Sequence, residues 1–197
     1  MSSRTRPRCR GGEVAVTIEA LGDAGDGLAR HAGARVVVPG GLPGERHRVR
    51  LEASRGGTVQ ATSLEILDAV ERAAPPCPHH ARCGGCATQH VPEASEAAWR
   101  VERVRRALRR RGLEPEVTLA HKSPLGARRR LRLVVKGGRP PRLGYRERRS
   151  HRVVDVAACP IARGELTAAF APLRRLLAGL DARPEEVALT AFAQGLE

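Results

Sequence analysis

Aromatic side chains are scarce in this 197-residue sequence, which has one tryptophan, one tyrosine and two phenylalanines. Its hydrophobic cores must therefore be built from Leu, Val, Ile and Ala, and the length allows one ordinary domain or two small ones. The sequence also lacks an apolar run of transmembrane length, and its start, MSSRTRPRCRGG, lacks the apolar middle of a secretory signal. These absences predict a cytoplasmic protein with no membrane partner.

Lysine is also scarce, since Lys122 and Lys136 are the only two, so the formal net charge of +14 comes from arginine. The excess is confined to residues 100–152, which hold 19 basic and 4 acidic side chains, against 12 and 11 in residues 1–99. A solvated surface usually mixes its signs. The concentration of positive charge therefore predicts a polyanionic partner rather than an ordinary charged face.

Residues 13–70 carry the pattern of short strands separated by glycine turns. The segment EVAVTIEA alternates polar and apolar residues, as a half-buried strand does, and LGDAGDG then interrupts it. Four or five such strands in so few residues predict a small closed barrel of the oligonucleotide-binding kind. The residues before it, 1–12, are interpreted as a basic tail.

Residues 77–197 mix helical and strand patterns and are predicted to form an α+β domain with an antiparallel sheet. An amphipathic helix is expected at about 92–111, with Gly112 as its stop, and a second helix at about 163–180. Between and after them, strands are expected around 131–135, 143–146, 153–156 and 187–192. The last strand would start a hairpin whose return strand the chain does not supply, which leaves the domain incomplete at its C-terminal end.

Arginines recur on these elements at spacings that place them on the solvent face. In the strand near residue 131, Arg128, Arg130 and Arg132 point away from Leu131 and Leu133, because successive strand side chains face opposite sides. The arginines predicted to contact the polyanion are Arg48 and Arg50 in the barrel, Arg103, Arg106 and Arg110 on the helix, and Arg128, Arg130, Arg132, Arg146 and Arg148 in the second domain.

Three of the five cysteines crowd into CPHHARCGGCATQH, and a fourth follows at ACPI, with the spacing C-x5-C-x2-C-x72-C. Four thiolates suit either a structural zinc ion or an iron–sulfur cluster. The grouping of three plus one favours the cluster, in which each cysteine binds a different iron. A thioredoxin-like redox pair is a weaker alternative, because CGGC does not open a helix after a strand. Cys9, in the basic tail, is interpreted as a free thiol.

The motifs CPHHARCGGCATQHV, RRRLRLVV and LGYRERRSHRVVDVAACPI together resemble the bacterial RNA (uracil-5-)-methyltransferases, in particular the branch that acts on large-subunit ribosomal RNA. In that branch the N-terminal barrel is a TRAM domain, which VTIEALGDAGDGLARHAGARVVVPGGLPGE resembles. The resemblance implies that Cys77, Cys83, Cys86 and Cys159 hold a [4Fe-4S] cluster. It also implies a structured RNA partner, ribosomal RNA in particular.

The family's methyl transfer resides in a C-terminal domain that binds S-adenosylmethionine and supplies a nucleophilic cysteine. No glycine-rich strand–loop–helix pattern follows residue 160, and Cys159 is the last cysteine, so no catalytic residue is assigned here. The hypothesis is an RNA-binding, cluster-bearing portion of such an enzyme, inactive alone, either truncated or working with a separately encoded catalytic domain that brings S-adenosylmethionine. The alternatives are a stand-alone RNA-binding module with a structural zinc or iron–sulfur site, and a small electron-transfer protein.

Overall fold

The computed structural model describes residues 11–181, 184–192 and 195–196, so Cys9 and most of the predicted basic tail lie outside the described residues. The chain divides into two compact units, of which unit 1 contains residues up to Ala74 together with His90–Leu119, and unit 2 contains Pro75–Gln89 and the residues from Ala120 onward. Both units combine a β-sheet with few helices. None of the described helices has both the length and the apolar character needed to cross a membrane.

Unit 1 is built on a six-stranded sheet with the order β1-β5-β6-β4-β3-β2. The first strand, β1, pairs antiparallel with β5, while β2 pairs antiparallel with β3. Its strands are β1 (Glu13–Thr17), β2 (Ala20–Leu21), β3 (Gly27–His31), β4 (Ala34–Val38), β5 (Arg46–Arg55) and β6 (Thr58–Asp68).

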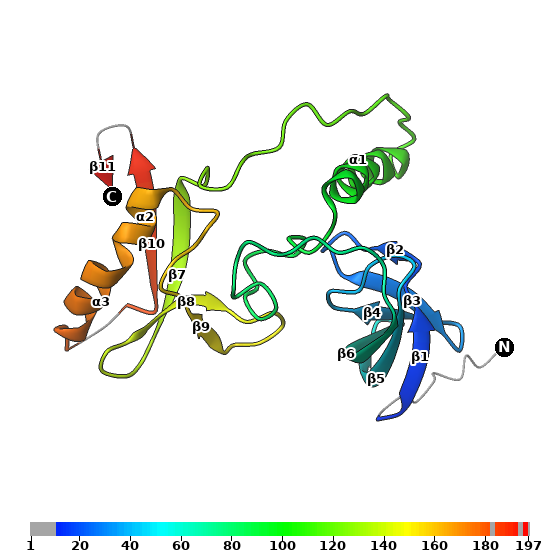
Figure 1. The fold of residues 1–197 in the computed structure, drawn as a ribbon, viewed down its shortest axis with the longest axis horizontal. Helices are drawn as coiled ribbons and strands as arrows, with labels where there is room; N and C mark the ends of the chain where they lie inside the picture. Colours follow the sequence, from blue (N-terminus) through cyan, green and yellow to red (C-terminus); the bar gives the residue numbers. More distant parts are fainter. Residues whose placement is uncertain (1–10, 182–183, 193–194, 197) are drawn as a thin grey trace. The chain divides into compact units, whose positions relative to one another are not determined.

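The sheet of unit 1 curls because its two edge strands belong to one bent segment (Figure 1). Only Ile18 and Glu19 separate β1 from β2, and their N–H groups bond to the carbonyls of Glu45 and Leu28, which continues the pairing around the bend. This curled sheet agrees with the predicted small barrel, with six strands where four or five were expected. Register shifts between β5 and β6 accommodate the curvature.

The barrel core contains only small and medium aliphatic side chains, as the scarcity of aromatics predicts. Its buried members are Val16, Ile18, Ala29, Val36, Val38, Val49, Leu51, Val59 and Ala61. Close packing leaves no room for a side chain at Gly27, where a Cβ would lie 2.8 Å from the carbonyl oxygen of Gly41 and 2.9 Å from Cγ2 of Ile18. The GDAGDG segment therefore acts as a turn into β3, and its last glycine is needed for packing.

Helix α1 (Glu93–Arg109) groups with the barrel in unit 1, whereas the sequence places it in the second domain. Acidic side chains in its first turn and arginines in its last turn complement the helix dipole, and Gly112, at φ +73°, lies just beyond its end. Its Trp99 packs against Leu21, Leu42 and Val91, and the indole Nε1 donates to the carbonyl oxygen of Gly22 at 3.0 Å. This aromatic anchor decides where the helix packs.

Unit 2 contains a five-stranded antiparallel sheet with the order β11-β10-β7-β8-β9. The predicted strands are all present: β7 (Arg130–Lys136), β8 (Arg142–Arg146), β9 (Val153–Asp155) and β10 (Glu186–Phe192). The predicted hairpin has a short return strand of two residues, β11 (Gly195–Leu196), which pairs with β10. The turn predicted over Ala193 and Gln194 lies outside the described residues.

The predicted second helix is observed as two helices, α2 (Gly164–Ala168) and α3 (Phe170–Ala178). Pro172 explains the interruption, because it lacks the N–H that would bond to the carbonyl of Ala168. Both helices keep one apolar stripe, in which Leu166, Phe170 and Leu177 are fully or almost fully buried.

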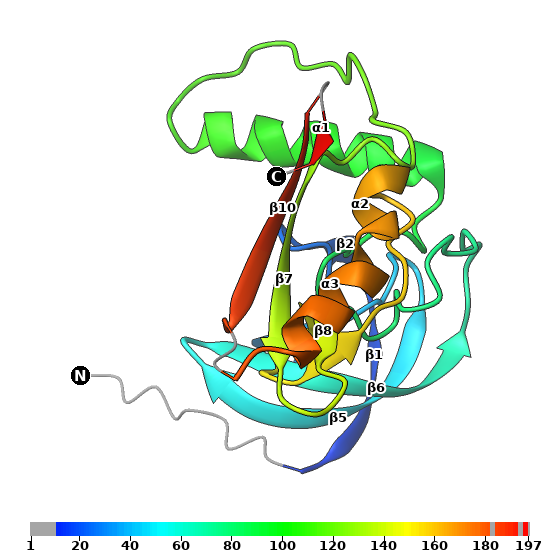
Figure 2. The same ribbon diagram turned by 90° about the vertical axis from the view of Figure 1, so that its left-hand side faces the viewer.

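The helices cover one face of the sheet of unit 2 and leave the other face open (Figures 1 and 2). The covered face consists of alternate strand residues, among them Leu131, Leu133, Leu143 and Leu189, which pack against the helices in one core. The side chains between them in the sequence face the other way. The alternation that the sequence shows thus sorts aliphatic side chains to the helices and arginines to solvent.

Candidate cysteine centre and nucleic-acid interface

Four cysteines of unit 2 line one small cavity, although Cys159 lies far along the chain from the other three. None of these four, Cys77, Cys83, Cys86 and Cys159, forms a disulfide. The structure thus brings together all four cysteines that the sequence singles out. Four thiols around one cavity are a donor set that suits a zinc ion or an iron–sulfur cluster.

The loop that carries three of these cysteines is fixed by backbone hydrogen bonds. Within it, the Cys83 N–H donates to the carbonyl of His79 at 2.7 Å, and Gly84 donates to the carbonyl of Arg146 at 2.9 Å. Cys83 also forms an isolated bridge with Glu147. A Cβ on Gly84 would lie 2.8 Å from the Arg146 oxygen, so this close contact requires glycine.

Cys159 reaches the cavity from the loop between β9 and α2. Its carbonyl accepts from the N–H of Ala162 at 2.9 Å, which forms a tight turn. Its own N–H donates to Oγ1 of Thr167 at 3.5 Å, and the hydroxyl of Tyr145 donates to its Sγ at 3.7 Å. The position of this thiol is therefore set by both its backbone and its sulfur.

Burial raises the pKa of the Cys83 and Cys86 thiols, and the neighbouring cysteines add to the effect. Positive charges act in the opposite direction, Arg148 on Cys83 and Arg128 on Cys86. Arg148 is itself held close, since its Nη2 donates to the carbonyl of Cys86 at 2.5 Å. A buried set of thiols becomes anionic only with a cation to balance it, which is what a metal centre provides.

Gln89 gives a further indication about the same cavity, which it lines. Its side-chain amide is buried, and hydrogen bonding from it lowers the pKa of the Cys86 thiol. The NH₂ group of an amide suits a sulfur acceptor. His79 and His80 also line the cavity. No three His, Cys, Asp or Glu side chains in the described ranges are placed to hold a metal ion.

The predicted RNA-contacting arginines of unit 2 separate into two groups. Arg130 and Arg132 lie on β7 and Arg146 on β8, all three exposed on the open face of the sheet. Arg128 precedes β7 and lines the cysteine cavity instead, as its backbone bonds to Ile161 and Arg163. Lys136 and Arg142, on the same two strands, lie on this open face as well.

One acidic side chain lies among these cations. Glu186 on β10 approaches Nη1 of Arg132 at 3.8 Å and Nη2 of Arg146 at 3.7 Å. The β10 neighbours of Arg130 and Arg132 are Thr190 and Ala188, which are uncharged. The open face thus carries several cations, and Glu186 lies between two of them, Arg132 and Arg146.

The predicted arginines of unit 1 are largely engaged in surface pairs. Arg48 pairs with Glu65 on β6, and Arg50 with Glu13 on β1 at 3.3 Å. On α1, Arg106 and Arg110 approach the two carboxylate oxygens of Asp23 at 3.3 and 3.6 Å. Arg103 stacks on the Trp99 ring, 4.7 Å from its centroid. These five help to hold unit 1 together, and exposed pairs of this kind also remain available to a polyanion.

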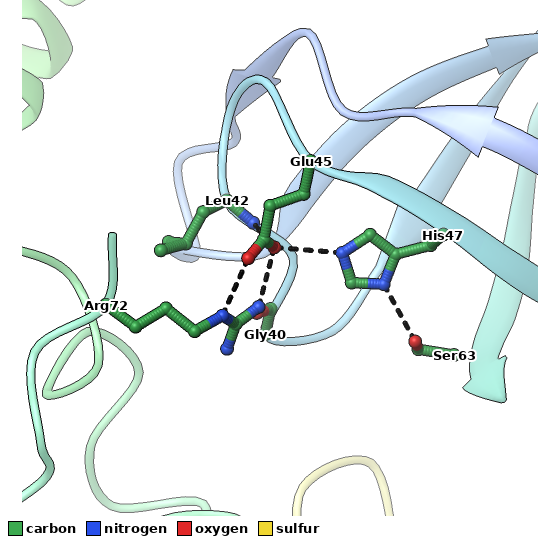
Figure 3. Close-up of polar contacts among 6 residues, drawn as sticks. All are labelled: Gly40, Leu42, Glu45, His47, Ser63 and Arg72. Carbon is green, nitrogen blue, oxygen red and sulfur yellow. Dashed lines mark hydrogen bonds and ion pairs between the residues drawn. The ribbon is translucent and has the colours of Figure 1, made fainter. Parts of the chain in front are cut away.

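A buried polar network in unit 1 was not predicted (Figure 3). Glu45 is fully buried and accepts from Nε and Nη2 of Arg72, each at 2.6 Å, and from the N–H of Leu42 at 2.7 Å. His47 lies between it and Ser63, with ring nitrogens 2.9 Å from Oε2 of Glu45 and 2.8 Å from the serine hydroxyl. The network ties the turn before β5 to the segment that follows β6.

The barrel of unit 1 matches a known domain family. The sequence model of the TRAM domain matches residues 7–64, which include all of β1 to β5 and most of β6. A solved structure with a similar fold is the tRNA (uracil-54, C5)-methyltransferase of Pyrococcus abyssi in complex with S-adenosyl-L-homocysteine. It has a TM-score of 0.54 and 22% identity, over 82% of this chain and 36% of that one.

Relatives with higher sequence identity are RNA methyltransferases. An uncharacterized RNA methyltransferase of Caulobacter vibrioides is 42% identical over 165 residues, which cover 82% of this chain and 39% of that protein. The 23S rRNA (uracil(1939)-C(5))-methyltransferase RlmD of Pectobacterium atrosepticum is 37% identical over 184 residues, 90% of this chain and 41% of that protein. The chain therefore carries a TRAM domain and is similar to these RNA methyltransferases over most of its own length. It spans about two fifths of the length of the curated relatives it matches.

Proposed function

We propose that this chain is the RNA-binding and cluster-bearing portion of a ribosomal RNA (uracil-5-)-methyltransferase. Its relatives modify RNA, and its TRAM domain belongs to a class of RNA-binding modules. The main support for the proposal is the difference between the two faces of the sheet of unit 2. Helices cover one face, and arginines occupy the other.

The open face suits the phosphate backbone of a folded RNA. Guanidinium groups bind phosphate oxygens through paired N–H donors, and a sheet holds several of them at fixed spacings. Arg132 and Arg146 keep 76% and 51% of their side chains exposed, so they reach a partner without unfolding anything. RNA specificity would then come from the shape of the RNA and from the contacts of the TRAM barrel.

A titration of the chain with a fragment of large-subunit ribosomal RNA at several salt concentrations tests this proposal. Each arginine that neutralises a phosphate contributes slightly less than one unit to the slope of log K against log salt. We expect Arg130→Ala and Arg132→Ala each to weaken binding and to reduce that slope by about 0.7–0.9. The matched control is Arg175→Ala, which removes an exposed arginine from α3 on the covered side. Equal effects in all three variants would exclude the open face as the interface.

We further propose that Cys77, Cys83, Cys86 and Cys159 hold a [4Fe-4S] cluster. The support is the shared cavity, the buried amide of Gln89 and the resemblance of the cysteine spacing to that of the family. A cubane cluster binds each cysteine to a different iron, so its sulfurs are farther apart than around one zinc ion. Such a cluster would stabilise unit 2 by joining two distant segments.

Iron, zinc and acid-labile sulfide analysis of anaerobically purified chain tests the cluster. We expect about four irons and four sulfides per chain, and broad absorption near ~400 nm. Cys159→Ser should lose iron and lower the melting temperature, because the 77–86 segment loses its link to the sheet. One zinc per chain without sulfide would instead support a structural zinc site.

Methyl transfer by the whole protein is part of the proposal, with S-adenosylmethionine bound by a catalytic segment outside these residues. With four cysteines committed to the cluster, only Cys9 remains as a thiol. The chain alone should therefore form no 5-methyluridine in ribosomal RNA when it is supplied with S-adenosylmethionine. Addition of a catalytic segment from a full-length relative should restore activity, and methylation by the chain alone would refute this division of roles.

A further inference from the structure

Tyr145 is the only tyrosine of the chain, and it lies on β8 beside the cysteine cavity. Its side chain points to the covered face of the sheet and packs against the core of unit 2. Its hydroxyl donates to Sγ of Cys159 at 3.7 Å, within the range of hydrogen bonds to sulfur.

The tyrosine ring also contacts the other cysteine-bearing segment. A Cβ on Gly85 would lie 3.9 Å from Cγ of Tyr145 and 3.5 Å from Sγ of Cys83, so the ring lies against the glycine backbone. The Gly85 N–H donates to Sγ of Cys83 at 3.4 Å. Tyr145 thus joins the Cys83–Cys86 loop to Cys159, and each of these segments has one sulfur that already accepts a hydrogen bond.

A hydrogen bond to a cysteine sulfur withdraws electron density from the metal centre. It therefore stabilises the reduced state, which carries one more negative charge, and raises the reduction potential. In a buried site a single such bond has more effect than in water, because the local dielectric constant is low. The hydroxyl of Tyr145 is placed for this effect by its hydrogen bond to Sγ of Cys159. The ring packs in the core, and this packing does not depend on the hydroxyl.

We propose that Tyr145 is a positioning residue that tunes the cluster by hydrogen bonding to Cys159, and that it raises the reduction potential and slows oxidative loss of the cluster. This inference rests on the proposed cluster. Tyr145→Phe keeps the ring packing and removes only the hydroxyl. The expected result is a lower midpoint potential in a dithionite titration and faster bleaching in air than in the wild type.

Thr190→Val is the matched control, because it also removes one hydroxyl from the same sheet, at a β10 residue that does not line the cysteine cavity. Its potential should equal that of the wild type. A second measurement does not depend on a substitution: growth on 3-fluorotyrosine labels Tyr145 alone, since the chain has no other tyrosine. The fluorinated phenol is a stronger donor, so the potential should move upward, opposite to Tyr145→Phe.

The outcomes separate this inference from the proposed function. A wild-type chain without iron and sulfide overturns both the cluster and the role of Tyr145. A loaded wild type whose potential and bleaching rate are unchanged by Tyr145→Phe and by fluorination overturns the role of Tyr145 and leaves the cluster in place. Equal shifts in Thr190→Val and Tyr145→Phe would likewise overturn it, because they would show an effect that does not depend on the hydrogen bond to Cys159.

Discussion

Replacement of Glu45 by glutamine should destabilise unit 1 far more than loss of a surface carboxylate. Glu45 accepts two hydrogen bonds from Arg72 at 2.6 Å, one from the Leu42 N–H and one with His47, and no part of it is exposed. Glutamine keeps the size of the side chain but removes the charge. It also brings an NH₂ group, which is a donor, next to the N–H groups of Leu42 and Arg72, which are donors too.

The magnitude follows from the burial of the two partners. Breaking a buried ion pair from one side costs about 3–5 kcal/mol, because the remaining charge stays desolvated. Arg72 retains 30% exposure of its side chain, so water compensates part of the loss. We expect the free energy of unfolding to fall by about 2–3 kcal/mol.

Tryptophan fluorescence during urea denaturation measures this loss in unit 1 specifically. Trp99 is the only tryptophan and packs on Leu21 and Leu42, next to the turn that Glu45 holds. The control is Glu65→Gln, whose pair with Arg48 is about half exposed on both sides. It should cost less than about 1 kcal/mol. Equal losses in the two variants would refute the argument that burial makes the Glu45 network important.

The pH dependence of the same transition gives an independent check. Burial would raise the pKa of Glu45, but the hydrogen bonds from Arg72, Leu42 and His47 hold it below the ordinary value of 4.5. A carboxyl with a lowered pKa in the folded state stabilises the fold above its unfolded pKa, and this contribution is lost as the pH falls through the folded pKa. The wild type should therefore lose stability on acidification below about 4.5, and Glu45→Gln should lack that component.

Two further predictions concern unit 2. Glu186→Gln removes the carboxylate that lies beside Arg132 and Arg146, so RNA should bind about two- to fivefold more tightly at low salt, corresponding to at most about 1 kcal/mol. Glu165→Gln on α2 should leave the affinity unchanged in the same titration, and weaker binding by Glu186→Gln would contradict the assignment. Gly84→Ala places a Cβ 2.8 Å from the Arg146 carbonyl and should lower the iron content, whereas Gly137→Ala, with nothing within 4 Å, should keep it.

The strand pattern was sufficient to predict most of the fold. Alternation placed β1, β4 and the strands of unit 2 close to their observed positions, because one buried face leaves a clear period of two. The same alternation extends from Val49 and Leu51 back to His47 and Glu45, which are buried in register with them. A carboxylate and an imidazole at inward-facing strand positions, Glu45 and His47, therefore indicate a buried polar network, although the network was not predicted.

Contacts between segments that are far apart in the chain could not be predicted from alternation. Alternation put Arg128 with Arg130 and Arg132, but the strand begins only at Arg130, since backbone bonds to Ile161 and Arg163 turn Arg128 toward the cysteines. The placement of α1 with the barrel depends on Trp99, whose partners cannot be deduced from its own segment. Tyr145 likewise gains its proposed role only from the approach of Cys159 in space.

Photocrosslinking from a defined position measures most directly whether RNA binds the open face of unit 2. Ala188 is exposed on β10 opposite Arg132, and Leu176 is 63% exposed on α3, on the covered side of the same sheet. With p-benzoylphenylalanine at each position in turn, irradiation with a ribosomal RNA fragment should crosslink RNA efficiently from position 188 and only at background level from position 176. Crosslinking from 176 that equals or exceeds that from 188 would contradict the account.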